Sequence, residues 1–279
     1  MHDTLMRSAL FVPANRPDRF PKAIASGADV VIVDLEDSVA PDDKSTARDA
    51  LVRYAAEHPQ DRLWVRINDG STPWFDDDLA MCRELSAVAG IVLPKAQAAE
   101  HVYTVSGAGK PLIPAIESAQ GLRVLDDIAG ANGVVRLTFG ILDLMVEFGT
   151  RPRTEGAQRI LDQVRFQILQ ASRMHGLADP VDTIYADFSD LEGLERTAVL
   201  ARDMGFGGML CIHPKQVPVV HQVYQPLPEE LDWAQRVVDH ADSTGEYAFR
   251  LDGRMVDLPV IESARRVLER GNLYRMRSA

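Results

Sequence analysis

Two carboxylates stand where short apolar runs end, and they are the clearest sign of chemistry in the chain. The run PLIPAI ends at Glu117, and the run VVRLTFGIL ends at Asp143. Such runs, bounded by Gly and Pro, are typical of strands buried on both faces, and α/β proteins place their ligands at the carboxyl ends of these strands. Two acids that share one crevice repel each other unless a proton or a cation lies between them, and oxygen ligands favour Mg²⁺. The pattern predicts a Mg²⁺ site, although Glu117 could instead cap a helix that begins at Ser118, with Asp143 solvated.

Three more acids follow another apolar run in the segment Asp34-Leu35-Glu36-Asp37. Asp34 and Glu36 stand at alternate positions and therefore point the same way, which is costly inside a protein unless cations pair with them. Lys44 and Arg48 lie on the following helix and are candidate partners. An ion-pair network that includes Asp37 is at least as good an interpretation as direct catalysis.

Several cationic or titratable side chains lie at other run ends. Arg66 in VRIN could bind a ligand carboxylate through its planar fork, or it could form an internal ion pair, and Lys95 carries the same ambiguity. His213 could act as an acid or base, or be a hydrogen-bonded core histidine. Arg16 and Lys22 place positive charge near a helix start, which suits phosphate, although exposed basic residues are usually only solvated.

The elements that must position these residues repeat regularly along the chain. Short apolar runs alternate with segments that could form amphipathic helices, which is typical of a parallel sheet covered on both faces. Eight such runs within about 215 residues favour a closed (β/α)₈ TIM barrel over an open sheet, and no glycine-rich nucleotide-binding motif follows a strand. The runs cover residues 8–13, 29–36, 63–68, 90–96, 111–117, 134–143, 182–188 and 208–214.

The remainder of the chain has no place in such a barrel. We therefore predict a TIM barrel over residues 1–223 and a C-terminal cap or oligomerisation segment over residues 224–279. Within that segment, Pro228 with the two following acids is a good helix start, and a final helix is predicted over about residues 258–270.

Bulk properties narrow the class of protein. The chain has 279 residues, 46% of them hydrophobic, and no apolar run approaches membrane-spanning length. Its net charge of −11 argues against nucleic acid and anionic membranes as partners. The N-terminus lacks the features of a signal peptide, and two cysteines fit a reducing compartment, so we expect a cytoplasmic protein.

Nine motifs in order resemble the citrate lyase beta-subunit and malyl-CoA lyase group of CoA-thioester lyases. The resemblance implies a TIM barrel with a C-terminal cap, assembled as a homotrimer or hexamer. It covers residues 7 to about 262, through RSALFVPANRP, ADVVIVDLEDSVAPDDK, VRIN, GIVLPKA, PAIESAQGL, FGxxDL, DFxDLEGL, GFGGMLCIHPKQ and GRMVDLPV.

The resemblance also implies roles for particular residues. The Mg²⁺ ligands of the family fall on Glu117 and Asp143, and the arginine that binds the substrate carboxylate falls on Arg66. The acid supplied by the C-terminal segment falls on Asp257, which we expect to act in the site of a neighbouring subunit or, alternatively, only to cap the N-terminus of the helix that begins at Leu258. Many members carry an acid where this chain has Leu142, which leaves the exact substrate open. Contacts to coenzyme A at the barrel mouth fall on Phe11, Arg16 and Lys22, with His213 nearby.

The implied reaction is Mg²⁺-dependent cleavage of a 3-hydroxy-acyl-CoA, such as citryl-, malyl- or citramalyl-CoA, to acetyl-CoA and a 2-oxo acid, or the reverse condensation. Two alternatives stay open. One is a metal-dependent aldolase of free hydroxy-diacids, against which the basic mouth at Arg16 and Lys22 argues. The other is a non-catalytic acyl-CoA-binding subunit of a lyase complex, against which the joint presence of Glu117, Asp143 and Asp257 argues.

Overall fold

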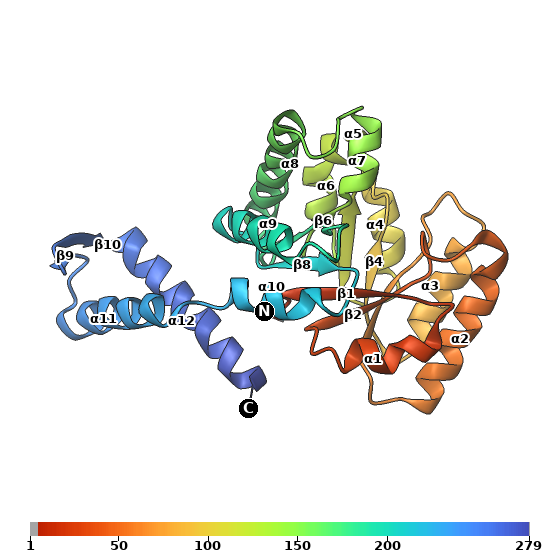
Figure 1. The fold of residues 1–279 in the computed structure, drawn as a ribbon, viewed down its shortest axis with the longest axis horizontal. Coiled ribbons are helices and arrows are strands. Elements are labelled where there is room, and N and C mark those ends of the chain that lie inside the picture. The colour runs from red at the N-terminus through yellow and green to blue at the C-terminus, as the bar shows by residue number, and fades with distance from the viewer. Residues whose placement is uncertain (1–4, 279) are drawn as a thin grey trace. The chain divides into compact units, whose positions relative to one another are not determined.

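The structure, a computed structural model, describes residues 5–278, with side chains to residue 274. The chain divides into two compact units, of which the first ends at Val223 and the second begins at Tyr224. Figure 1 shows the first unit in red to cyan and the second in blue.

The first unit is a barrel of eight parallel strands with helices between them, as the sequence predicted (Figure 1). Hydrogen-bonded neighbours follow the order β6-β5-β4-β3-β2-β1-β8-β7. The barrel is nearly closed, because the Val181 N–H of β7 donates over 3.0 Å to the carbonyl of Leu137, which directly precedes β6. The strands are β1 (Ser8–Pro13), β2 (Val30–Asp34), β3 (Leu63–Arg66), β4 (Val88–Leu93), β5 (Leu112–Ile116), β6 (Thr138–Phe139), β7 (Val181–Asp182) and β8 (Gly208–Cys211).

Burial explains why these runs form strands. Every residue of β2 and β5 is buried, so their continuous apolar sequences meet the needs of both faces. Side chains from most of the strands form one apolar cluster that includes Ile32, Trp64 and Leu210. The cluster depends on Gly90, because a Cβ there would lie 2.5 Å from the Trp64 ring. Apolar packing therefore fixes the strand ends from which the polar side chains project.

The connecting segments form helices that flank the strands. They are η1 (Pro17–Arg19), α1 (Phe20–Ile24), η2 (Pro41–Asp43), α2 (Lys44–Glu57), α3 (Phe75–Glu84), α4 (Ala99–Ser106), α5 (Ala119–Arg123), α6 (Leu125–Ala129), α7 (Ile141–Glu147), α8 (Glu155–Met174), α9 (Leu191–Asp203) and α10 (Gln216–Tyr224).

The sixth and seventh predicted strands are wrong over most of their length, since β6 covers only Thr138–Phe139 of residues 134–143 and β7 covers only Val181–Asp182 against the predicted residues 182–188. The run over residues 134–143 was expected to be one strand ending at Asp143, but β6 has two residues, and α7 begins at Ile141. Gly140 is the N-cap of this helix, and Asp143 lies in its first turn. A carboxylate is favourable at that position because the helix N-terminus carries partial positive charge.

The second unit combines two helices and a hairpin. It contains α11 (Pro228–Thr244), the antiparallel strands β9 (Ala248–Leu251) and β10 (Arg254–Asp257), and α12 (Leu258–Ser278). Val237, Val256 and Ile261 belong to its own buried apolar cluster. The start of α11 at Pro228 was predicted, whereas α12 continues well past the predicted end near residue 270. Within the described range, no helix has both the length and the apolarity needed to cross a membrane.

Candidate functional site

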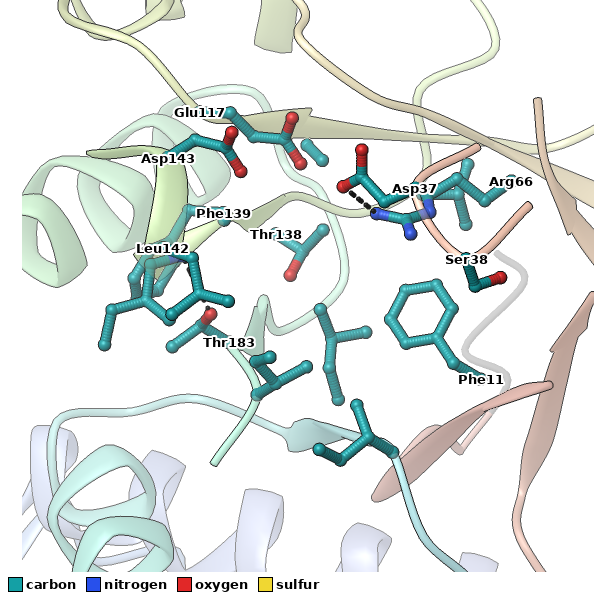
Figure 2. Close-up of a pocket in the computed structure, with 17 residues that line it drawn as sticks. Phe11, Asp37, Ser38, Arg66, Glu117, Thr138, Phe139, Leu142, Asp143 and Thr183 are labelled. Atoms are coloured by element: carbon teal, nitrogen blue, oxygen red, sulfur yellow. Dashed lines mark hydrogen bonds and ion pairs between the residues drawn. The ribbon is translucent and has the colours of Figure 1, made fainter. Parts of the chain in front are cut away.

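A cavity of about 310 Å³ lies at the carboxyl ends of the barrel strands (Figure 2). Most of its wall is apolar, with contributions from Phe11, Phe139, Leu142 and Ile212. Its polar lining consists of three acids, one cation and three hydroxyl groups, which are Asp37, Glu117, Asp143, Arg66, Ser38, Thr138 and Thr183. An apolar cavity with few convergent polar groups is the usual form of a small-molecule site.

Glu117 directly follows β5 and is only 7% exposed. It does not cap the next helix, because Ser118 is the N-cap of α5 and accepts from the Gly121 N–H over 3.1 Å. Glu117 Oε2 instead accepts from the Lys95 N–H over 3.1 Å. Burial, together with the negative charges of Glu36 and Asp143, raises the pKa of Glu117 to about 8 despite the opposing effect of Arg66. Its surroundings therefore disfavour the ionised form of Glu117.

Figure 2 shows the carboxylates of Glu117 and Asp143 directed toward the same part of the cavity. Glu117 is buried at the end of β5, and Asp143 is exposed on the first turn of α7. Gly140 allows this approach, because a Cβ there would lie 2.8 Å from Glu117 Cγ. In the part of the chain that is described, no three acidic, histidine or cysteine side chains form a metal-binding group. Two carboxylates that line the same cavity match the needs of Mg²⁺, which keeps several of its waters.

Arg66 lies at the end of β3, where it is held by acids. Its Nε and Nη2 donate to Asp34 over 2.7 and 2.8 Å, and Nη1 lies 3.0 Å from Glu36 Oε2. Its guanidinium carbon lies 4.8 Å from the Phe11 ring centroid. Although burial alone would raise the pKa of Asp34, its pairing with Arg66 holds that pKa below the usual range. The internal ion pair that the sequence left open is therefore present, and the bidentate fork is occupied by Asp34.

Lys95 connects this network to Glu117. Its side-chain ammonium lies 2.5 Å from Glu36 Oε1 and 3.8 Å from Asp37 Oδ1. Its backbone N–H donates to the Glu117 carboxylate. The residue adopts a left-handed conformation with φ of 48°, which is uncommon for any residue other than glycine. Lys95 thus links the acids that follow β2 to the acid that follows β5.

Two expected ion pairs are wrong. Lys44 donates to the backbone carbonyls of Leu35 and Glu36, each over 2.7 Å, and not to the carboxylates of Asp34 or Glu36. Arg48 instead pairs with Asp77 and Asp78 on α3. In the loop after β2, the carbonyls of Leu35 and Glu36 face Lys44 on α2. The carboxylates of Asp34 and Glu36 face Arg66 and Lys95 instead. Lys44 therefore supports the loop backbone.

The residues expected to contact coenzyme A lie in β1, in α1 and in the segments that follow β1 and β8. Phe11 lines the cavity, whereas Arg16 is exposed and paired with Asp18 over 2.8 Å. His213 stacks on Phe188 with 4.9 Å between ring centroids, and its Nδ1 accepts from the Lys215 N–H. Burial lowers the pKa of His213, and so do the charges of Lys215 and Lys22. Lys22 and His213, far apart in sequence, are therefore electrostatic neighbours.

Asp257, the remaining expected site residue, ends β10 in the second unit. Its Oδ1 accepts from the Val260 N–H over 3.4 Å. This contact is the helix cap that the sequence left open, although it is long for a hydrogen bond.

Sequence reasoning missed part of the cavity lining. Ser38, Thr138 and Thr183 were not singled out, and neither was Phe188 beside His213. Hydroxyl groups inside apolar strands carry little signal, because a threonine is equally at home in an ordinary strand. The alternation along a two-residue strand such as β6 is also too short to show which side chain faces the cavity.

Comparisons with known proteins identify a family. The family model described as HpcH/HpaI aldolase/citrate lyase matches residues 7–214. A citrate lyase subunit beta-like protein of Mycobacterium tuberculosis is 40% identical, over 94% of both chains. A (3S)-malyl-CoA thioesterase of Cereibacter sphaeroides is 34% identical, over 94% of this chain and 93% of the other.

A solved structure shows the same relationship in three dimensions. It is the protein CitE from Mycobacterium tuberculosis in complex with magnesium, acetoacetate and coenzyme A, and it superposes with a TM-score of 0.84 at 37% sequence identity. The superposition covers 97% of this chain and 99% of that chain. These findings confirm the family that the nine motifs predicted: the chain belongs to the HpcH/HpaI aldolase/citrate lyase family.

Proposed function

We propose that this protein is a Mg²⁺-dependent carbon–carbon lyase. It cleaves a 3-hydroxy-acyl-CoA to acetyl-CoA and a 2-oxo acid, or catalyses the reverse condensation. The observation that carries the proposal is that Glu117 and Asp143 together line a largely apolar cavity, which Arg66 also lines. A relative that binds magnesium, acetoacetate and coenzyme A supports the same chemistry.

The residues present fit a Mg²⁺ ion. Glu117 is buried and is opposed by the charges of Glu36 and Asp143, and its Oε2 accepts only from the uncharged backbone N–H of Lys95 among the described contacts. A bound Mg²⁺ would remove this repulsion, with Glu117 and Asp143 as its protein ligands and waters or substrate oxygens as the others. When bound, the ion would polarise the hydroxyl group and the neighbouring carboxylate of the substrate.

The chain's own residues supply the other parts of the reaction. Some N–H groups of Arg66 are not used in its ion pairs with the acids. Arg66 offers these groups to a substrate carboxylate. Apolar residues such as Phe139 and Leu142 exclude water, which strengthens every charge interaction in the cavity. The enolate of acetyl-CoA must then receive a proton at its methylene carbon from a positioned acid, for which Asp257 is the candidate.

Coenzyme A is proposed to enter along the segment that carries Phe11 in β1, Arg16 and Lys22 in α1, with His213 nearby. The stacked rings of Phe188 and His213, with Lys22 close enough to lower the His213 pKa, offer an aromatic surface beside positive charge. Both features suit a nucleotide with phosphate groups.

We also propose that the protein is cytoplasmic, because Cys82 and Cys211 are free and buried.

We propose that the second unit serves as a cap and oligomer contact in a homotrimer or hexamer. Tyr247, Met255 and Leu258 lie on or beside its hairpin and are 72%, 73% and 46% exposed. Large exposed apolar side chains at and beside one short hairpin favour a surface that contacts another chain. Asp257 lies among them, so a contact there would bring its carboxylate to a neighbouring subunit.

Mg²⁺ affinity is expected to increase with pH. Metal binding at Glu117 displaces a proton wherever that carboxyl is protonated, and its pKa is raised to about 8. The apparent Kd for Mg²⁺ should therefore fall about tenfold per pH unit from about pH 6 to about pH 8, and then level off. Isothermal titration calorimetry in buffers of different ionisation enthalpy measures both Kd and the proton released. A Kd that is independent of pH would contradict the assignment of Glu117 as a ligand.

Arg66→Lys should weaken 2-oxo acid binding by roughly 1.5–3 kcal/mol, because a lysine ammonium cannot hold Asp34 as the fork does and also present the remaining N–H groups to the ligand. The measurement is a Mg²⁺-dependent binding titration with pyruvate or oxaloacetate. Asp34→Asn is the control, because it weakens the ion pair that holds Arg66 and leaves the guanidinium itself in the cavity. Normal affinity in Arg66→Ala would make Arg66 a structural residue only.

A small panel of thioesters tests the proposed function. Citryl-, malyl- and citramalyl-CoA are incubated with the protein in Mg²⁺ or in EDTA, and acetyl-CoA is measured. We expect acetyl-CoA from at least one thioester, in Mg²⁺ only. Equal activity in EDTA, or activity on free hydroxy-diacids alone, would contradict the proposal.

A further inference from the structure

The proposed reaction leaves one proton without an acceptor. Cleavage requires loss of the proton on the 3-hydroxyl group of the substrate, and a base must take it. Glu117 and Asp143 are committed to the metal, and Arg66 is a cation. Among the residues that line the cavity, the carboxylate left is Asp37.

Asp37 differs from the two acids that precede it in the same loop. The side chains of Asp34 and Glu36 are 3% and 5% exposed, and both make close contacts with Arg66. The side chain of Asp37 is 60% exposed, and its nearest cationic atoms, Arg66 Nη1 and Lys95 Nζ, lie 3.6 and 3.8 Å away. Those distances exceed a hydrogen bond, so the carboxylate is accessible to a ligand.

The arrangement divides the work among the three acids. Arg66 has its strongest contacts with Asp34, at 2.7 and 2.8 Å, and Lys95 has its closest contact with Glu36, at 2.5 Å. The cations are therefore held without Asp37. Figure 2 shows Asp37 between Arg66 and the Glu117–Asp143 pair in this view, in a position to face a ligand that spans them.

We propose that Asp37 is the catalytic base, acting within its own chain, that accepts the 3-hydroxyl proton during cleavage. This inference rests on the proposed function. As the O–H bond breaks, its electron pair forms the carbonyl of the 2-oxo acid. The bond between C2 and C3 breaks, and its electron pair passes to the acetyl-CoA enolate, which takes a proton at C2 from a separate acid. Asp37 then releases its proton to water, and in the condensation direction it returns the proton to the new hydroxyl group.

Asp37→Asn tests this role, because the amide keeps the shape of the side chain and cannot accept the proton. We expect the cleavage rate to fall about 10²–10⁴-fold, the usual contribution of a general base. Mg²⁺-dependent binding of the 2-oxo acid should stay within about threefold of wild type. The matched control is Asp42→Asn, which removes the same charge from an exposed position in η2 and should cleave at the wild-type rate.

A second measurement separates the two protons of the reaction. Exchange of the acetyl-CoA methyl protons with D₂O, followed by NMR or mass spectrometry, reports only on the group that works at C2. This exchange should persist in Asp37→Asn. Cleavage by Asp37→Asn within about threefold of wild type, loss of its 2-oxo acid binding, or loss of its methyl exchange would each overturn the role of Asp37. Failure of the wild-type protein to cleave any thioester would overturn the proposed function itself, before any variant is compared.

Discussion

Glu117→Gln is expected to abolish Mg²⁺ binding and turnover while it makes the metal-free protein more stable. Glutamine has nearly the shape of glutamate, so it can still accept the hydrogen bond from the Lys95 N–H. It no longer places a buried charge beside Glu36 and Asp143, which together with burial raise the Glu117 pKa to about 8. The residue that binds the metal is therefore a source of instability when the metal is absent.

The pH dependence of this effect has a definite sign. Because the Glu117 pKa is higher in the folded than in the unfolded protein, the unfolded state ionises first as pH rises, and the metal-free protein loses stability between about pH 4.5 and about pH 8. Above that window, Glu117→Gln should be more stable than wild type by about 2–4 kcal/mol in EDTA.

Denaturant unfolding at several pH values in EDTA, and again in Mg²⁺, measures the difference. Asp143→Asn is the matched control: it should also lose Mg²⁺ binding, but it should gain little stability because Asp143 is exposed. Mg²⁺ should raise the melting temperature of wild type and of neither variant. Normal turnover in Glu117→Gln, or a variant less stable than wild type in EDTA at pH 8, would contradict this assignment.

The second large effect is expected from mixtures of inactive variants. If Asp257 acts in the site of a neighbouring subunit, Glu117→Gln and Asp257→Asn should each be inactive alone. A mixed oligomer combines an intact barrel with an intact Asp257 at some of its sites, and activity should return there. Closed homo-oligomers allow this exchange at every interface.

The measurement is acetyl-CoA production after the two variants are unfolded and refolded together, with subunit exchange verified by mass spectrometry of tagged chains. Each variant refolded alone serves as the control. Absence of recovery despite verified exchange would place Asp257 in the site of its own chain. Full activity of Asp257→Asn alone would reduce it to the helix cap seen in its contact with the Val260 N–H.

The fold could be predicted from the sequence because the apolar runs and their spacing are direct consequences of burial. The first strand was predicted to the residue, as Ser8–Pro13, and the fifth to within a residue of its ends. The prediction was wrong at β6, where the apolar run continues into α7. A run of leucine, isoleucine and phenylalanine suits a buried strand or a helix start equally, so the pattern does not show that β6 ends at Phe139 and α7 begins at Ile141.

The charged residues of the candidate site could be singled out from the sequence, but their pairings could not. The sequence showed that Asp34, Glu36 and Arg66 need partners, because such charges are costly near a barrel core. It could not show that Arg66 gives its fork to Asp34, or that Lys44 turns to backbone carbonyls. Pairing depends on the register between neighbouring strands, where Asp34 stands beside Arg66, and no local pattern records that register.

The products of thioester cleavage test the central claim most directly. A relative in this family is a (3S)-malyl-CoA thioesterase, so carbon–carbon cleavage must be separated from hydrolysis. Wild-type protein, Mg²⁺ and the preferred thioester are incubated in H₂¹⁸O, and all acyl products are quantified by mass spectrometry. The account predicts acetyl-CoA and the 2-oxo acid in equal amounts as the first products, with the thioester bond intact. Free coenzyme A with an ¹⁸O-labelled hydroxy acid, and no acetyl-CoA at any time, would contradict it.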